Sequence, residues 1–170
     1  MRRFFALALQ LAALSTIAAP PQVTTVIVVR HAEKTGPTGD VPLSDAGRAR
    51  ARELARVLAG ASVTAIYDTQ YLRTQQTAEP LAESLKIKPT VAGTTDAYAA
   101  DLVKDIEAHH AGGTVVVVSH SNLIPDLLRD LGIEKPPAIG DAQYDDLFVV
   151  TRAPGAAPKL LALRYGAAAR

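Results

Sequence analysis

The sequence predicts an α/β fold, a three-layer α/β/α sandwich with a mostly parallel central sheet. Two runs, Val26–Val29 and Thr114–Ser119, are rich in β-branched residues without polar alternation, which is typical of strands buried on both faces. Segments with apolar residues at helical spacing alternate with the expected strands, and this alternation favours helices that cover a sheet. With 170 residues and 48% hydrophobic content, the chain suffices for one domain with a sizeable core.

The first strand is followed by a loop over Thr35–Val41, which contains two glycines and a proline. The first helix is expected over Asp45–Ala59. Ser44 is a good N-cap residue, and the acidic side chain of Asp45 suits the positive end of the helix dipole. Gly60 is expected to end this helix.

A short second strand is expected over Val63–Tyr67, before another stretch of helical spacing. Pro80 lacks the N–H that a helix interior requires. We therefore expect one helix over Leu72–Glu79 and a second short piece from Pro80. Arg73 would lie in the first turn of this helix, close to the end of the preceding strand.

The second half of the chain continues the alternation. An edge strand is expected over Ile87–Val91, and a helix over Ala97–His110 that Asp96 could cap. After the Thr114–Ser119 strand, Asn122 is expected to cap the last helix. That helix and two final strands are predicted over Leu123–Leu131, Leu147–Thr151 and Leu160–Tyr165.

The N-terminal stretch MRRFFALALQLAALSTIAAP has two arginines, then an apolar run, then small residues. This pattern is typical of a secretory signal peptide. It predicts a signal peptide over residues 1–19, a mature domain over residues 20–170, and a periplasmic or secreted product without stable membrane insertion after cleavage. An N-terminal helix packed on the domain and an uncleaved anchor are the alternatives.

Composition excludes several classes of function. The 18 basic and 17 acidic residues include Arg2 and Arg3, whose removal would leave the mature chain close to neutral. No basic face with interleaved aromatic residues indicates a nucleic-acid partner. The chain has no cysteine, which excludes disulfides, thiolate catalysis and cysteine-based zinc sites. The sequence contains no heptad pattern from which an oligomeric state could be predicted.

Polar side chains gather where the predicted strands end. Arg30, His31 and Glu33 follow the first strand, His120 follows the Thr114–Ser119 strand, and Arg73 follows the second. Ligands of open α/β sheets bind at the carboxyl ends of the strands. Two arginines suit the oxygens of a phosphoryl group. A histidine with a free ring nitrogen can attack phosphorus and carry that group covalently.

Glu33 leaves two interpretations open. It could be an ion-pair partner that holds Arg30, or it could take part in the pocket itself. A metal site built from His31, Glu33 and His120 is conceivable, but two arginines in the same pocket would repel a cation. Tyr144 could line the rim of the pocket or belong to an ordinary loop.

Three segments in this order resemble the motifs of the histidine phosphatase superfamily, also called phosphoglycerate mutase-like. Arg30-His31-Ala32-Glu33 is similar to its Arg-His-Gly signature, with alanine in place of glycine. Arg73–Ala78 resembles its second-arginine motif, and Ser119–Asn122 its second-histidine motif. The resemblance covers about Val26–Thr151.

This resemblance implies that His31 is the nucleophile and becomes phosphohistidine. Arg30, Arg73 and His120 would form the rest of the phosphate pocket, with Ser121 and Asn122 as further substrate-binding candidates. It implies no metal and no organic cofactor.

The resemblance also calls for a carboxylic acid that protonates the leaving oxygen. Asp96 is the best-placed candidate, with its role as a helix N-cap as the alternative. Asp101, Asp145 and Asp146 are the others. If no acid is present, substrates with good leaving groups, such as phosphohistidine or acyl phosphates, are favoured.

The predicted function is therefore an extracytoplasmic phosphatase that acts on a phosphomonoester or a phosphohistidine-type bond. Its partner would be a small phosphorylated substrate or a phosphoprotein. A phosphomutase is one alternative, but mutases of this superfamily usually carry a long insertion between the segments of Arg73 and His120, and this chain lacks it. In this respect the chain resembles the small phosphatase branch, which includes phosphohistidine phosphatases. A non-catalytic module that binds phosphorylated ligands is another, although such a module needs no nucleophile.

Overall fold

A mixed sheet of six strands forms the middle layer of the computed structural model, which describes residues 22–168. The strand order is β3-β2-β4-β1-β5-β6. The neighbours β3, β2, β4 and β1 run parallel, whereas β5 and β6 are antiparallel additions beside β1. The strands are β1 (Thr24–Arg30), β2 (Val63–Thr69), β3 (Thr90–Ala92), β4 (Thr114–Ser119), β5 (Asp146–Arg152) and β6 (Lys159–Arg164).

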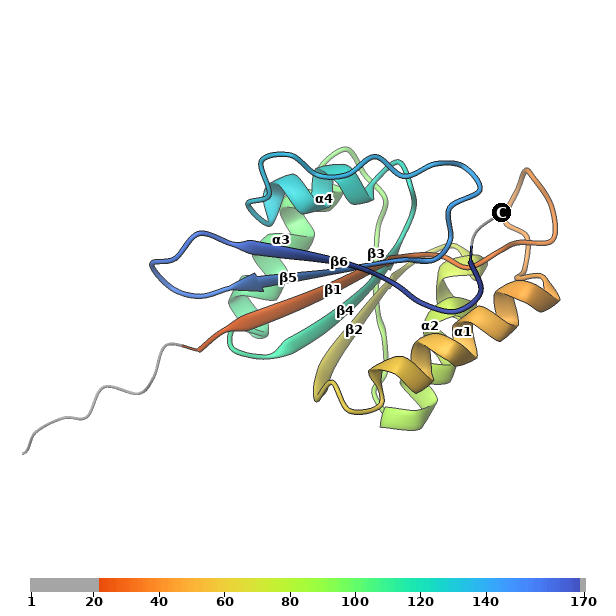
Figure 1. Cartoon of the computed structure of the whole chain (residues 1–170), viewed down its shortest axis with the longest axis horizontal. Helices are drawn as coiled ribbons and strands as arrows, with labels where there is room; N and C mark the ends of the chain where they lie inside the picture. Colours follow the sequence, from red (N-terminus) through yellow and green to blue (C-terminus); the bar gives the residue numbers. More distant parts are fainter. Residues whose placement is uncertain (1–21, 169–170) are drawn as a thin grey trace, which may run out of the picture.

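Helices cover both faces of this sheet, as Figure 1 shows. They are α1 (Asp45–Leu58), α2 (Leu72–Leu85), α3 (Tyr98–His109) and α4 (Ile124–Asp130). Buried residues of α1 and α2 pack with Ile27 and Val29 of β1. Those of α3 and α4 pack with Val26 and Val28. Because alternate residues of a strand point to opposite faces, the uninterrupted apolar run of β1 serves both layers. The predicted three-layer sandwich is confirmed.

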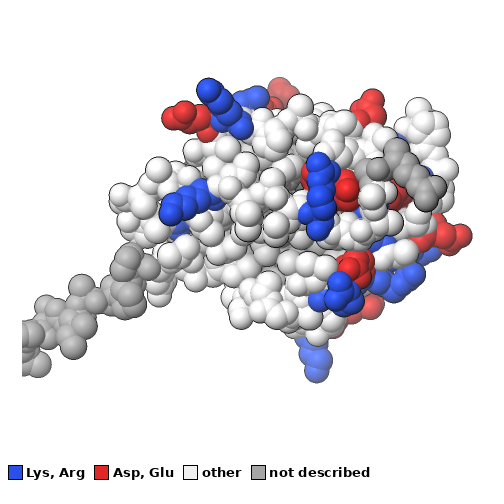
Figure 2. Space-filling view, in the orientation of Figure 1, with Lys and Arg blue, Asp and Glu red and all other residues white. Residues whose placement is uncertain are grey.

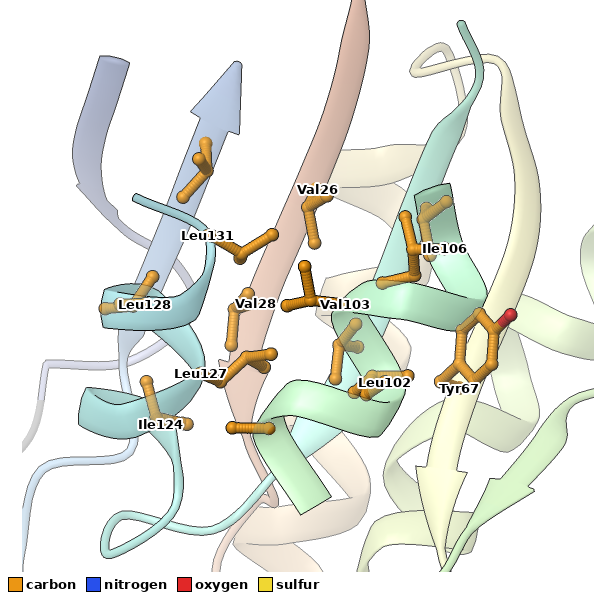
Figure 3. Close-up of a cluster of buried hydrophobic side chains, with 14 of the residues drawn as sticks. Val26, Val28, Tyr67, Leu102, Val103, Ile106, Ile124, Leu127, Leu128 and Leu131 are labelled. Carbon is orange, nitrogen blue, oxygen red and sulfur yellow. The ribbon is translucent and has the colours of Figure 1, made fainter. Parts of the chain in front are cut away.

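The core between the sheet and the helices α3 and α4 consists mainly of aliphatic side chains (Figure 3). Val26 and Val28 face Val103 of α3, Leu127 of α4 and Leu131, which directly follows α4, and all five are at most 7% exposed. Burial of each such side chain contributes about 1.5–3 kcal/mol. The core therefore holds the carboxyl end of β1 in a defined place.

The break predicted at Pro80 is wrong, because α2 runs through this residue without interruption. The proline removes one helical hydrogen bond. Ala78 and Leu81, on either side of it, are completely buried against the sheet, and this packing keeps both halves of α2 in one helix.

Of the three predicted N-caps, only Ser44 is confirmed. Its hydroxyl accepts a hydrogen bond from the Gly47 N–H at 3.1 Å. The capping roles predicted for Asp96 and Asn122 are wrong, since neither side chain caps a helix. At α4 the His120 carbonyl performs this role and accepts the N–H groups of Leu123 and Ile124, where the helix begins.

Charges of both signs are interspersed on the face shown in Figure 2, with broad uncharged areas between them. Within residues 22–168, no helix is both long enough and apolar enough to cross a membrane. The predicted signal peptide, residues 1–19, lies outside the described residues.

Candidate active site

The two histidines meet because they end neighbouring parallel strands. Arg30 of β1 is in register with Ser119 of β4, and the His31 N–H extends this ladder by donating to the Ser119 carbonyl at 2.8 Å. His31 and His120 therefore leave the sheet side by side. Their ring centroids are 5.4 Å apart, and both residues are buried.

Arg30 is fixed by backbone carbonyls rather than by an acid. Its Nη1 donates to the carbonyls of Gly140, Asp141 and Gln143 at 2.8–3.2 Å. Arg73, in the first turn of α2, places Nη2 at 3.4 Å from His120 Nδ1. The Nε atoms of both arginines are buried and have no hydrogen-bond partner within the described part of the chain. Two donors thus remain for an anion at this edge of the sheet.

The hydrogen bond of His31 determines its protonation. Nδ1 lies 2.8 Å from the Ala32 carbonyl, and a carbonyl only accepts, so Nδ1 carries the proton. Burial lowers the pKa of His31 to about 4, and the charges of Arg30 and Arg73 act in the same direction. At neutral pH the ring is therefore neutral, with a lone pair on Nε2.

A hydroxyl network supports His120. An arginine only donates, so Arg73 donates to Nδ1, and Nε2–H of His120 donates to Thr69 Oγ1 at 3.0 Å. The Thr69 hydroxyl in turn lies 2.9 Å from Thr74 Oγ1. Burial lowers the pKa of His120 to about 3, helped by the neighbouring Arg73 charge. The sequence analysis did not identify Thr69 or Thr74 as supporting residues.

Two tyrosines extend the pair of histidines into a row of four rings. Tyr144 lies 6.0 Å from His31, and Tyr71 lies 5.3 Å from His120, measured between ring centroids. Each tyrosine also stacks under an arginine, Tyr144 at 4.1 Å from Arg30 and Tyr71 at 4.3 Å from Arg73. Such cation–π contacts orient the guanidinium planes. Tyr71 was missed, because a tyrosine before a helix carries no signal of its own.

Asp40 is a further residue that sequence reasoning missed. From the loop after β1, its Oδ1 accepts the Leu72 N–H at 2.8 Å and lies 3.8 Å from Arg73 Nη1. It caps the first turn of α2 from a distant segment, where a local pattern cannot indicate the contact.

Glu33 does not hold Arg30, so this part of the prediction is wrong. Its carboxylate instead receives Nε and Nη2 of Arg50, a buried residue of α1, at 2.7–3.1 Å. Burial alone would raise the pKa of Glu33, but the Arg50 guanidinium lowers it overall. Arg50 also donates to the carbonyls of Tyr165 and Ala167 and so ties the end of the chain to the segment after β1.

The same segment requires a glycine in α1. A Cβ on Gly47 would lie 2.0 Å from the Glu33 carbonyl oxygen, which also accepts the Ser44 N–H at 2.9 Å. The helix thus packs directly on the backbone that follows His31.

The remaining candidates are not brought to the histidines. Within residues 22–168, no hydrogen bond or ion pair connects Asp96, Ser121 or Asn122 with His31, His120 or either arginine. Asp96 and Asp101 are exposed, and Asp145 and Asp146 pair with Arg164. In the same residues, no three histidine or carboxylate side chains are grouped so as to hold a metal ion.

Comparison with known proteins agrees with this geometry. The profile of the histidine phosphatase superfamily (branch 1) matches residues 26–96, a range that contains Arg30, His31 and Arg73. Residues 26–96 of the chain are thus similar to the histidine phosphatase superfamily. An 8-oxo-(d)GTP phosphatase of Mycolicibacterium smegmatis is 32% identical over 122 residues, which are 65% of this chain and 38% of that protein. The chain thus matches well under half of the length of this relative.

Several solved structures share the fold of this chain. "Mycobacterial hydrolase 1" has a TM-score of 0.70 at 21% identity, over 85% of this chain and all of the other. The mycobacterial glucosyl-3-phosphoglycerate phosphatase Rv2419c has a TM-score of 0.69 at 19% identity, over 85% of this chain and 100% of the other. The protein histidine phosphatase SixA, complexed with tungstate, has a TM-score of 0.65 at 21% identity, over 82% and 96% of the two chains.

Proposed function

We propose that this protein is an extracytoplasmic phosphatase that works through a phosphohistidine intermediate on His31. The observation that carries the proposal is a neutral His31 with Nε2 free, beside two arginines whose buried Nε–H groups have no partner. A phosphoryl group would supply the acceptors that these donors lack. The relatives named as phosphatases support the same activity.

In the first step the Nε2 lone pair attacks phosphorus, and the bond from phosphorus to the leaving atom breaks with its electron pair on that atom. Arg30 and Arg73 stabilise the negative charge on the phosphoryl oxygens. In the second step water attacks phosphorus, and the P–Nε2 bond breaks. The lone pair returns to His31, and the water proton passes to phosphate or solvent.

The substrate is proposed to have a good leaving group. In the described part of the chain, no carboxylate forms a hydrogen bond or ion pair with either histidine, so the proposed mechanism takes the proton of the leaving atom from solvent. A P–N bond of phosphohistidine or an acyl phosphate meets this condition better than an alkyl phosphate. The similarity in fold to the protein histidine phosphatase SixA is consistent with this choice.

The decisive experiment compares wild type with His31→Ala on three substrates: a phosphoramidate, para-nitrophenyl phosphate and glycerol phosphate. We expect kcat/KM to fall in that order for wild type and turnover to be absent in His31→Ala. Acid-quenched wild type should carry phosphate on His31, detected by mass spectrometry. Equal turnover by His31→Ala, or phosphate on another residue, would overturn the proposal.

The extracytoplasmic location rests on the residue pattern of the N-terminal stretch. Expression of the full chain in a bacterium, followed by fractionation and mass spectrometry, tests it. We expect a periplasmic or secreted product that begins near Pro20. An intact N-terminus in the cytoplasmic fraction would contradict this location without affecting the proposed chemistry.

A further inference from the structure

A groove of about 700 Å³ runs between α2 and the sheet edge at β3, outside the candidate active site. One stripe of α2 forms a wall of the groove, and Val91 of β3 and the segment before that strand form the other. Strand β3 has only three residues and lies at the edge of the sheet. Val91 remains 55% exposed. The groove therefore presents an apolar surface to solvent.

A buried carboxylate lies in this groove. Asp68 of β2 is in register with Val91, so the two side chains are neighbours on one face of the sheet. Asp68 is only 4% exposed, and its Oδ1 has no hydrogen-bond partner within the described part of the chain. A buried acceptor without a donor is unfavourable by about 1–3 kcal/mol. This residue has no function in the mechanism above.

The charges around Asp68 come from two elements. Glu79 and Glu83 of α2 line the same groove, as do Lys86 and Lys88 from the segment between α2 and β3. Lys86 lies about 20 Å along the helix axis from the start of α2, at 1.5 Å per residue. Glu83, three residues before Lys86, lies at the same end of the groove as the lysines. These four charged residues are exposed, whereas the Asp68 carboxylate is buried.

We propose that this groove binds an organic cation, an ammonium or guanidinium group on an apolar chain, whose charged end pairs with the Asp68 carboxylate. The cation supplies the donor that Oδ1 lacks, and Leu72 and Val91 cover the apolar chain. Burial raises the pKa of Asp68 to about 6, so at pH 7 most of this carboxyl is ionised and available for the ion pair.

Binding of n-hexylamine to the protein, followed by NMR, tests the inference, with n-hexanol as a neutral probe of similar shape. We expect hexylamine to shift the resonances of Asp68, Leu72 and Val91, and to bind at least about tenfold more tightly than hexanol. Asp68→Asn should weaken hexylamine binding by at least about tenfold. Asp130→Asn, at an exposed position of α4, should bind as wild type does.

A second measurement needs no variant. Protonation of a carboxyl with a pKa of about 6 should reduce hexylamine affinity about tenfold between pH 7 and pH 5, and should leave hexanol affinity unchanged. A blocked lysine peptide that binds as tightly as hexylamine would assign the cation to a protein side chain. A peptide that does not bind would assign it to a small amine.

Equal affinity for hexylamine and hexanol, equal affinity of Asp68→Asn and wild type, or the absence of saturable binding would each overturn the proposal. These experiments measure binding, not turnover. Their failure is therefore distinguishable from a failure of the proposed phosphatase activity.

Discussion

The two buried histidines should make the stability of this protein fall steeply in mild acid. Histidine in an unfolded chain has a pKa near 6.5, whereas burial lowers the pKa of His31 to about 4. Between these values the unfolded state binds a proton that the folded state does not, so folding stability decreases as the pH falls from 6.5 to 4. At 1.36 kcal/mol per pKa unit, His31 alone accounts for about 3 kcal/mol.

Urea unfolding at a series of pH values between 7 and 4 measures this effect. Carboxylates also contribute to the acid loss, so the comparison with His31→Gln isolates the histidine. Glutamine remains neutral, and we expect this variant to lose about 3 kcal/mol less than wild type over the same range. His109→Gln, which removes an exposed histidine of α3, is the matched control and should lose as much as wild type.

The lowered pKa of His31 is refuted if wild type and His31→Gln lose the same free energy of unfolding. It is also refuted if NMR titration of the His31 ring gives a midpoint of 6 or above. Either result would mean that this ring is solvated or paired with an acid in the folded protein, which contradicts its burial beside Arg30 and Arg73.

Three further predictions concern the supports of the site. Arg50→Ala removes a buried guanidinium and leaves the partly buried Glu33 carboxylate and the carbonyls of Tyr165 and Ala167 without their donor. It should lower the free energy of unfolding by about 3 kcal/mol, measured in urea; a loss below about 1 kcal/mol would contradict this role. Gly47→Ala forces α1 away from the Glu33 carbonyl and should destabilise by about 3 kcal/mol. Gly60→Ala, where nothing lies within 4 Å of the added Cβ, should leave the melting temperature nearly unchanged. Asp40→Ala removes the cap of α2 and should destabilise by about 1 kcal/mol, and Asp40→Asn, which keeps an acceptor oxygen, should restore most of that loss in thermal melts.

Local patterns were most informative where burial on both faces leaves little choice of residue. The strand Thr114–Ser119 has the predicted bounds, and β1 contains the predicted Val26–Val29. Predictions that depended on one residue were weaker. Pro80 did not end a helix, and Asp96 and Asn122 did not cap one. At these positions the packing of a helix on the sheet outweighs the preference of a single side chain.

The sequence by itself determined the fold class and indicated the arginines and histidines that gather at one edge of the sheet. Two strands that read as buried in the sequence are followed by Arg30 and His31 in one case and by His120 in the other. Parallel pairing of these strands places their carboxyl ends at one edge of the sheet. The partners of these residues were decided only by the tertiary structure. The carbonyls that hold Arg30 lie 110–113 residues away along the chain. The ion-pair partner of Glu33 is Arg50 rather than Arg30. Hydrogen bonds and ion pairs act over a few ångströms in space and leave no periodic signal along a chain, so only the folded arrangement reveals them.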